Sequence, residues 1–220
     1  MTSAQERLGI LGGTFDPVHE GHLAAADAAR RACSLDRVLF MPSHQPPHRP
    51  AEPRASAFHR LAMVSLAVAS RDEFEASDLE LRRPGPSFTA DTLRDWQASG
   101  VGPWQIFFII GTDAFAEIAS WREYPAVLDL AHFVVIARPG QSFDALRDRL
   151  PGLAPRMRPA GDVPGEPPGG GSCAIFLVNA ATPDVSSTEI RERAARRLSL
   201  AGLVTPEVER YIREHGLYGS

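Results

Sequence analysis

The stretch Leu8-Gly-Ile-Leu-Gly-Gly-Thr-Phe-Asp-Pro-Val-His-Glu-Gly-His-Leu23 decides the fold. A short apolar run with strand character leads into two glycines, and a helical pattern begins after Pro17. Glycine lets the backbone turn sharply and brings N–H groups close to a ligand. A helix amino terminus favours anions. Strand, glycine turn and helix start together predict a binding site for a phosphorylated nucleotide.

Two histidines, His19 and His22, stand three positions apart in this stretch. If the helix begins near residue 18, they occupy neighbouring positions on one face, near the positive end of its dipole. Both rings can donate hydrogen bonds to phosphate oxygens, and Gly21 between them leaves room for a bulky nucleotide. A lone histidine is more often structural, but a pair after a Gly-Gly turn favours function. A zinc site is less favoured, because the spacing differs from HExxH and no third ligand is evident.

The composition indicates a single domain over residues 1–220 whose partner is a small molecule. The chain is 44% hydrophobic, which is enough for a core, and its net charge of -4 provides no basic field for nucleic acid. The amino terminus has no apolar signal core, and no apolar run reaches the ~20 residues that span a bilayer. Two distant cysteines fit a reducing compartment. We therefore expect a cytoplasmic protein without nucleic-acid or membrane partners, and leave its oligomeric state open.

Short apolar runs alternate with helical patterns along the chain, which predicts an α/β fold with a doubly wound parallel sheet. The expected strands are 8–11, 38–41, 106–110, 133–137 and 174–178. A C-terminal helical segment follows at 187–200 and 206–215, with Thr205 as an N-cap, Pro206 in the first turn and Gly216 after the end. Residues 151–172 contain six prolines and six glycines and predict a flexible surface insertion.

The run Gly12-Gly-Thr-Phe-Asp-Pro-Val-His-Glu-Gly-His22 resembles the signature of the HxGH nucleotidyltransferase superfamily, specifically its bacterial nicotinate-nucleotide adenylyltransferases. The resemblance implies a Rossmann-like sheet. It also implies an enzyme of NAD biosynthesis that transfers the adenylyl group of ATP to nicotinate mononucleotide, giving deamido-NAD and pyrophosphate. The segment Asp184-Val-Ser-Ser-Thr-Glu-Ile-Arg191 resembles the superfamily's Ile-Ser-Ser-Thr-x-Ile-Arg signature, which implies a triphosphate site. From the residues alone, Ser186 and Glu189 form a capping-type helix start, and this start itself presents an anion site.

Two segments resemble those with which the family binds the mononucleotide acceptor, and each differs from the family pattern at one residue. Met41-Pro-Ser-His-Gln-Pro-Pro-His-Arg49 ends in arginine where the family has lysine, and implies that Arg49 holds the mononucleotide phosphate and that His48 belongs to the mononucleotide site. The alternative is a proline-stiffened loop. Pro86-Ser-Phe-Thr-Ala-Asp-Thr-Leu93 carries Phe88 in place of the usual tyrosine. It implies that the Thr89 amide meets the nicotinate carboxylate, and it also suits an ordinary helix start.

Two further segments complete the resemblance. Phe107-Phe-Ile-Ile-Gly-Thr-Asp113 ends a buried strand with a carboxylate that either accepts from ribose hydroxyls or caps the next helix. Trp121 matches the family tryptophan that stacks on the nicotinate ring, although a lone tryptophan is more often a core residue. Arg122 would supply a neighbouring amide, and Arg138 follows the next strand at the same edge.

The implied site has three groups of residues. The catalytic residues are His19, His22 and Arg191. The ATP-binding residues are Gly12, Gly13, Thr14, Phe15, His19, His22, Gly111, Asp113, Ser187, Thr188 and Arg191. The mononucleotide-binding residues are Thr14, Asp16, His48, Arg49, Thr89, Trp121, Arg122 and Arg138. Mg²⁺ is expected to arrive with ATP, and no protein metal ligand is expected.

Two alternatives stay open. One is a sister adenylyltransferase that acts on nicotinamide mononucleotide, pantetheine phosphate or FMN. The other, from a different class, is a nucleotide sensor without catalysis. The presence of His19, His22 and Arg191 together argues against a sensor, and an assay of pyrophosphate release with each acceptor separates all three.

Overall fold

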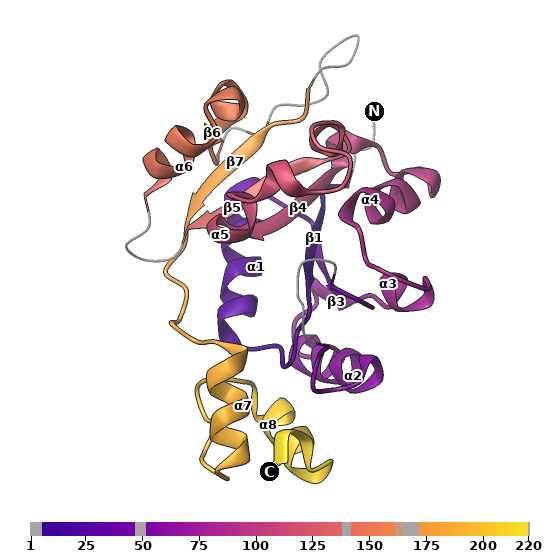
Figure 1. The fold of residues 1–220 in the computed structure, drawn as a ribbon, viewed down its shortest axis with the longest axis vertical. Helices are drawn as coiled ribbons and strands as arrows, with labels where there is room; N and C mark the ends of the chain where they lie inside the picture. The colour runs from indigo at the N-terminus through magenta and orange to yellow at the C-terminus, as the bar shows by residue number, and fades with distance from the viewer. Residues whose placement is uncertain (1–5, 47–51, 138–141, 162, 164–171, 220) are drawn as a thin grey trace. The chain divides into compact units, whose positions relative to one another are not determined.

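The computed structural model describes residues 6–46, 52–137, 142–161, 163 and 172–219. Its ribbon is drawn in Figure 1. The strands are β1 (Leu8–Gly13), β2 (Arg37–Pro42), β3 (Phe74–Ala76), β4 (Ile106–Gly111), β5 (His132–Ala137), β6 (Met157–Pro159) and β7 (Ile175–Asn179). The α-helices are α1 (Glu20–Cys33), α2 (Ala57–Val68), α3 (Leu79–Arg82), α4 (Thr89–Ala98), α5 (Thr112–Phe115), α6 (Phe143–Arg149), α7 (Ser187–Ala195) and α8 (Pro206–Glu214). Short 3₁₀ segments are η1 (Pro103–Gln105), η2 (Ile118–Ser120), η3 (Ala126–Asp129), η4 (Pro151–Arg156) and η5 (Leu217–Gly219).

The strands form one sheet in the order β3-β2-β1-β4-β5-β7-β6. From β1 the order runs outward in both directions, which is the pattern of a doubly wound sheet. The pairings of β1 with β4, β4 with β5, β5 with β7 and β6 with β7 are all parallel. The predicted Rossmann-like α/β fold with a C-terminal helical segment is therefore confirmed.

Packing divides the chain into two compact units. Unit 1 comprises Met1–Leu11, Ala25–Val38 and Phe88–Ala181. Unit 2 comprises Gly12–Ala24, Leu39–Ser87 and Thr182–Ser220. The assignment of residues 1–220 to one domain stays a prediction.

The core of unit 1 is built on the central strands. Every residue of β5 is buried, and so is every residue of β4 before Gly111. Parallel strands that are covered on both faces consist of continuous apolar residues, so these runs were recognisable as strands. Gly9 in β1 is needed for close packing, because a Cβ there would lie 2.9 Å from side-chain atoms of both Leu35 and Val38.

The core of unit 2 joins α2 to the C-terminal helices. Met63 and Val64 of α2 are fully buried, and α8 packs against α2. The start of α8 is as predicted: the Thr205 side chain accepts a hydrogen bond from the backbone N–H of Val208, and Pro206 occupies the first turn. Gly216 follows the helix with a φ of 57°, the left-handed conformation that ends helices.

Two predictions about local structure need correction, and one strand was missed. Helix α7 ends at Ala195 and not at residue 200, because Arg197 has a φ of 55°, which a helix does not allow. Strand β3 was not predicted, because three residues are too few to show the apolar run or the apolar–polar alternation that indicates a strand. The prediction of a flexible insertion at 151–172 is wrong for its first residues, where η4 and β6 form, with Leu153 and Met157 buried. Residues 162 and 164–171 of this segment lie outside the described residues.

The two cysteines, Cys33 and Cys173, are buried free thiols. Burial raises the pKa of Cys33 to about 12 and that of Cys173 to about 11. Because the thiolate is the reactive form, neither residue is a nucleophile at neutral pH.

Within the described ranges, no helix is both long enough and apolar enough to cross a bilayer.

Candidate functional site

The β1–α1 loop, residues 14–19, lies in unit 2 and forms a tight turn after the two glycines. Phe15 has a φ of 49°, which is uncommon for a residue with a side chain, and its ring is buried. The ring folds back over Gly13, where a Cβ would lie 3.1 Å from the Phe15 ring. The same ring meets His22 edge-on, with 5.0 Å between centroids. Gly13 therefore makes room for Phe15, and Phe15 supports His22.

The two histidines lie against each other. Helix α1 begins at Glu20, so His19 precedes the helix and His22 lies in its first turn. Their rings stack with 3.7 Å between centroids. The backbone N–H of His19 donates to Nδ1 of His22 over 3.2 Å, so a neutral His22 carries its proton on Nε2. His22 is thereby oriented as a donor through Nε2.

Gly21 is needed for this arrangement. A Cβ at this position would lie 3.1 Å from ring atoms of His19 and 3.4 Å from the carbonyl oxygen of Pro183. Contacts of this length force a neighbour to shift, and the carbonyl belongs to the backbone. The room for a nucleotide beside Gly21 stays a prediction, and within the protein the absence of a side chain here makes room for the His19 ring.

The amino end of α7 docks on the β1–α1 loop. The side chain of Ser186 accepts from the N–H of Glu189, as the capping pattern predicts. Ser187 Oγ donates to the carbonyl oxygen of Pro17 over 2.9 Å. Arg191 donates through Nη1 to the carbonyl oxygen of Asp16 over 2.7 Å and through Nη2 to Thr188 Oγ1 over 3.0 Å. The structure therefore brings Arg191 to the same loop as His19, although about 170 positions separate them in sequence.

Asp16 is the structural centre of the loop. Its side chain is 5% exposed, and its carboxylate accepts from the backbone N–H groups of Arg54 at 2.8 Å and Ala55 at 3.1 Å. The hydroxyl of Tyr218 donates to the same carboxylate over 2.8 Å. The protein itself thus supplies three donors to the carboxylate that the sequence assigned to mononucleotide binding.

Two residues of this centre were missed by sequence reasoning. Arg60 on α2 is 1% exposed and donates to the carbonyl oxygens of Thr14 at 2.8 Å and His44 at 3.4 Å. Burial lowers the pKa of Arg60, while Asp16 and Tyr218 act in the opposite direction. Burial, reinforced by the Asp16 carboxylate, raises the pKa of Tyr218 above its usual value, so the hydroxyl stays protonated as a donor. Nothing in the sequence around Tyr218 indicated a contact with Asp16, which lies 202 positions away.

The residues predicted to hold the pyridine ring lie in unit 1. Helix α4 begins at Thr89, as predicted, after Phe88 in extended conformation. Trp121 follows η2, is half-buried and meets the ring of Phe108 edge-on at 6.1 Å. Arg122 places its guanidinium 4.7 Å from the centre of the Phe88 ring. The structure thus joins the Phe88–Thr89 segment to the Trp121–Arg122 segment within one unit.

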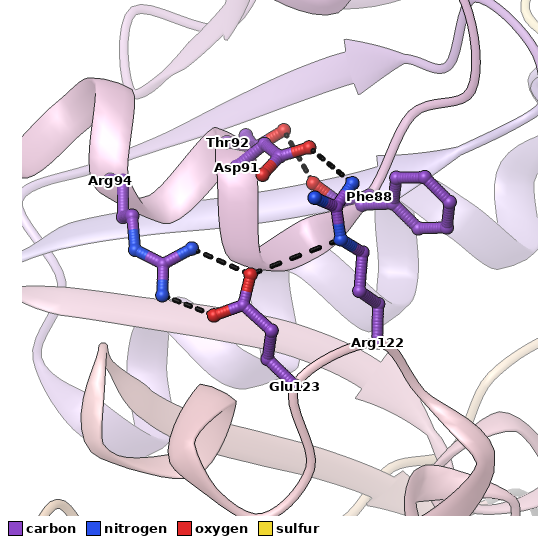
Figure 2. A network of polar contacts seen from close by, with 6 residues as sticks. All are labelled: Phe88, Asp91, Thr92, Arg94, Arg122 and Glu123. Carbon is purple, nitrogen blue, oxygen red and sulfur yellow. Dashed lines mark hydrogen bonds and ion pairs between the residues drawn. The ribbon is translucent and has the colours of Figure 1, made fainter.

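A chain of charged side chains connects these two segments (Figure 2). Arg122 pairs with Asp91 at 3.3 Å and with Glu123 at 3.9 Å. Arg94 donates from both terminal nitrogens to the two oxygens of Glu123. The hydrogen bond from Arg94 keeps the pKa of Glu123 below its ordinary value, so this carboxylate is ionised at neutral pH. Sequence reasoning assigned roles to neither Arg94 nor Glu123, because each reads as an ordinary surface charge.

Gly111 and Asp113 lie at the end of β4 in unit 1. Gly111 is the residue before α5, and Asp113 is an exposed residue of that helix's first turn. Asp113 is therefore not the N-cap of this helix. His48, Arg49 and Arg138 lie outside the described residues. In the part of the chain that the structure describes, no three His, Cys, Asp or Glu side chains cluster as a metal site.

Comparison with known proteins gives consistent results. The cytidylyltransferase-like family model matches residues 10–193. The probable nicotinate-nucleotide adenylyltransferase of Desulfatibacillum aliphaticivorans is 42% identical and covers 96% of this chain and 99% of its own length. That of Symbiobacterium thermophilum is 41% identical and covers 96% and 95%. The solved structure of Plasmodium falciparum nicotinic acid mononucleotide adenylyltransferase complexed with NaAD has a TM-score of 0.72 at 16% identity, covering 97% of this chain and 98% of that chain. This last likeness shows a common fold.

Proposed function

The chain belongs to the cytidylyltransferase-like family, and from this we propose that it transfers the adenylyl group of ATP to nicotinate mononucleotide, as a step of NAD biosynthesis. The products are deamido-NAD and pyrophosphate. The observation that carries the proposal is that the β1–α1 loop holds both the stacked His19–His22 pair at the start of α1 and, through the Asp16 carbonyl oxygen, Arg191. The names of relatives about 40% identical over nearly the full chain support the choice of acceptor.

The reaction is a direct in-line displacement. An oxygen of the mononucleotide 5′-phosphate attacks the α-phosphorus of ATP, and the bond to the pyrophosphate oxygen breaks. Such transfers depend on positioning and on stabilising the charge that develops, and need no protein nucleophile. His22 donates through Nε2 to phosphate oxygens, His19 stacks behind it, and Arg191 adds a positive charge.

The remaining ATP contacts come from backbone and hydroxyl groups. Gly12, Gly13, Thr14 and Phe15 present the turn to the nucleotide, and the first turn of α7, with Ser187 and Thr188, receives the outer phosphates. Mg²⁺ would arrive with ATP, where it would neutralise negative charge on the outer phosphates. Gly111 and Asp113 of unit 1 are also assigned to ATP binding, with the Asp113 carboxylate as an acceptor for ribose hydroxyls.

The acceptor occupies a second set of groups. Trp121 stacks on the pyridine ring, while backbone N–H groups of Thr89 and Arg122 face its carboxylate. Arg49 binds the phosphate of the mononucleotide, and His48 and Arg138 belong to the same acceptor site. Asp16 contributes by holding the loop that carries Thr14. A cytoplasmic location belongs to the same proposal and is supported by the two free cysteines.

The test is an assay of pyrophosphate release with ATP and each acceptor in turn: nicotinate mononucleotide, nicotinamide mononucleotide, pantetheine phosphate and FMN. We expect the highest kcat/KM with nicotinate mononucleotide. A higher value with another acceptor contradicts the proposed substrate and supports a sister transferase. Nucleotide binding without turnover on any acceptor supports a sensor.

His22→Ala tests the catalytic assignment. Loss of the oriented donor should lower kcat by about 10²- to 10³-fold, as removal of one transition-state donor does elsewhere. His215→Ala is the matched control, because His215 is an exposed residue beyond α8 that contacts Tyr211. Near-normal turnover of a folded His22→Ala variant contradicts the assigned role.

A further inference from the structure

The two segments assigned to the pyridine ring are tied together by side chains that do not themselves belong to the ring site. We propose that Arg94 and Glu123 are positioning residues that set the separation between the Thr89 backbone and Trp121, and thereby the preference for an acid over an amide mononucleotide. The inference rests on the proposed function and deepens it. It is based on the paired hydrogen bonds between the Arg94 guanidinium on α4 and the Glu123 carboxylate in the loop after η2.

The loop after η2 has a conformation that depends on its surroundings. Glu123 has a φ of 65°, in the left-handed region that residues with a side chain rarely adopt. The turn is closed by hydrogen bonds from Tyr124 N–H to the Trp121 carbonyl oxygen at 3.1 Å and from Val127 N–H to the Glu123 carbonyl oxygen at 3.0 Å. Arg94 holds the Glu123 carboxylate with both terminal nitrogens, a geometry that fixes direction as well as distance. The turn that carries Trp121 is therefore anchored to α4 through Glu123.

The charges in this network compensate one another. Asp91, Arg122, Glu123 and Arg94 alternate in sign along the contacts, as Figure 2 shows. The guanidinium of Arg122 also lies on the face of Phe88. Because Arg122 lies between two carboxylates of the protein, its charge is already balanced. Discrimination between a substrate carboxylate and an amide then falls to backbone N–H groups, whose positions the network holds.

The network also accounts for Phe88, the residue that departs from the family pattern. The contact with Arg122 uses the face of the ring, where an arginine is attracted to the aromatic electrons. A tyrosine hydroxyl would lie at the ring edge and is not needed for this contact. Phe88 thus forms one side of the connection between α4 and Arg122.

The consequence for binding follows from hydrogen-bond geometry. An N–H group that donates well at 2.9 Å donates poorly when it moves outward by several tenths of an ångström. An acid accepts from two N–H groups, whereas an amide presents an NH₂ to one of them, so a loosened turn costs the acid more. Release of the Glu123 anchor should therefore weaken acid binding selectively.

The experiment uses Arg94→Gln and Glu123→Gln, each of which removes one charge and keeps a similar size. Steady-state kinetics are measured for ATP, nicotinate mononucleotide and nicotinamide mononucleotide. We expect KM for the acid to rise about tenfold, consistent with loss of a charge-assisted hydrogen bond, while KM for ATP and kcat change less than about twofold. The ratio of kcat/KM for acid over amide should fall by the same factor.

Two further variants separate positioning from general damage. Arg94→Lys keeps the charge without the paired geometry and should give an intermediate KM for the acid. The double exchange of Arg94→Glu with Glu123→Arg should recover part of the acid preference. Arg147→Gln is the matched control, because Arg147 pairs with Asp144 on the surface of the same unit, at 3.0 Å. It should leave every constant unchanged.

Three outcomes overturn the inference: an unchanged acid preference in both single variants, equal losses for ATP and the acid, or no recovery in the double exchange. The wild-type assay with nicotinate mononucleotide is evaluated before the variants, because it tests the proposed function by itself. Absence of wild-type turnover with nicotinate mononucleotide contradicts the proposed function. Wild-type turnover with unaffected variants contradicts only the role of Arg94 and Glu123.

Discussion

Tyr218→Phe removes a single oxygen atom from the centre of unit 2 and tests the role of Asp16. The Tyr218 hydroxyl is one of three donors to a carboxylate that is 5% exposed, and the two others are the backbone N–H groups of residues 54 and 55. Phenylalanine fills the same volume apart from the hydroxyl. The variant therefore leaves the packing intact and deprives a buried carboxylate of one donor.

The expected cost follows from the charge of the acceptor. A hydrogen bond to an ionised group contributes about 1.5–3 kcal/mol, so we expect the free energy of unfolding to fall by about 2 kcal/mol. In a chain of this length, that change lowers Tm by about 4–8 °C. Turnover should fall as well, because Arg191 is anchored on the carbonyl oxygen of Asp16 itself.

The assay combines thermal unfolding with hydrogen exchange of the amides of Arg54 and Ala55, which should exchange faster when Asp16 is loosened. Tyr211→Phe is the matched control. Its hydroxyl lies 2.9 Å from Nδ1 of His59, a half-buried imidazole and not a buried carboxylate, so its loss should cost less than about 1 kcal/mol. Equal stability of the Tyr218→Phe variant and the wild type, with unchanged exchange at both amides, would refute the reasoning.

The other predictions concern pH and Gly21. Burial lowers the pKa of His132 to about 4 from 6.5, so the unfolded chain binds more protons below pH 6.5. The contribution of His132 to the free energy of unfolding should then be constant above pH 6.5. It should fall by up to about 3 kcal/mol as the pH decreases towards 4. Unfolding of His132→Asn across this range should show a smaller slope, and an identical slope rules out His132 as the source. Gly21→Ala should lower kcat about tenfold by displacing His19. Gly152→Ala is its control, with no atom within 4 Å of the new Cβ, and equal kcat in both variants contradicts the steric argument.

Local features were readable because their causes are local. The apolar runs of β4 and β5 indicate burial on both faces. Helix α4 begins at Thr89, although its N-cap is Phe88 and no side chain caps it. The start of α8 follows from a threonine and a proline in adjacent positions. The strands β3 and β6 were missed because three residues each are too few to show the apolar pattern that marked the longer strands.

The sequence by itself determined the residue types of the phosphate site: two glycines, two histidines and a distant Ser-Ser-Thr helix start with an arginine. The spacing of His19 and His22 also predicted their closeness, although α1 begins at Glu20 and not near residue 18, so that His19 precedes the helix. Tertiary structure alone decided which partners these groups have. Tyr218 reaches Asp16 across 202 positions and Arg191 reaches the same residue across 175, and Glu123 meets Arg94 across 29. Partners so far apart in sequence come into contact only when packing brings their helices and loops together, and a periodic pattern within a short segment carries no information about such contacts.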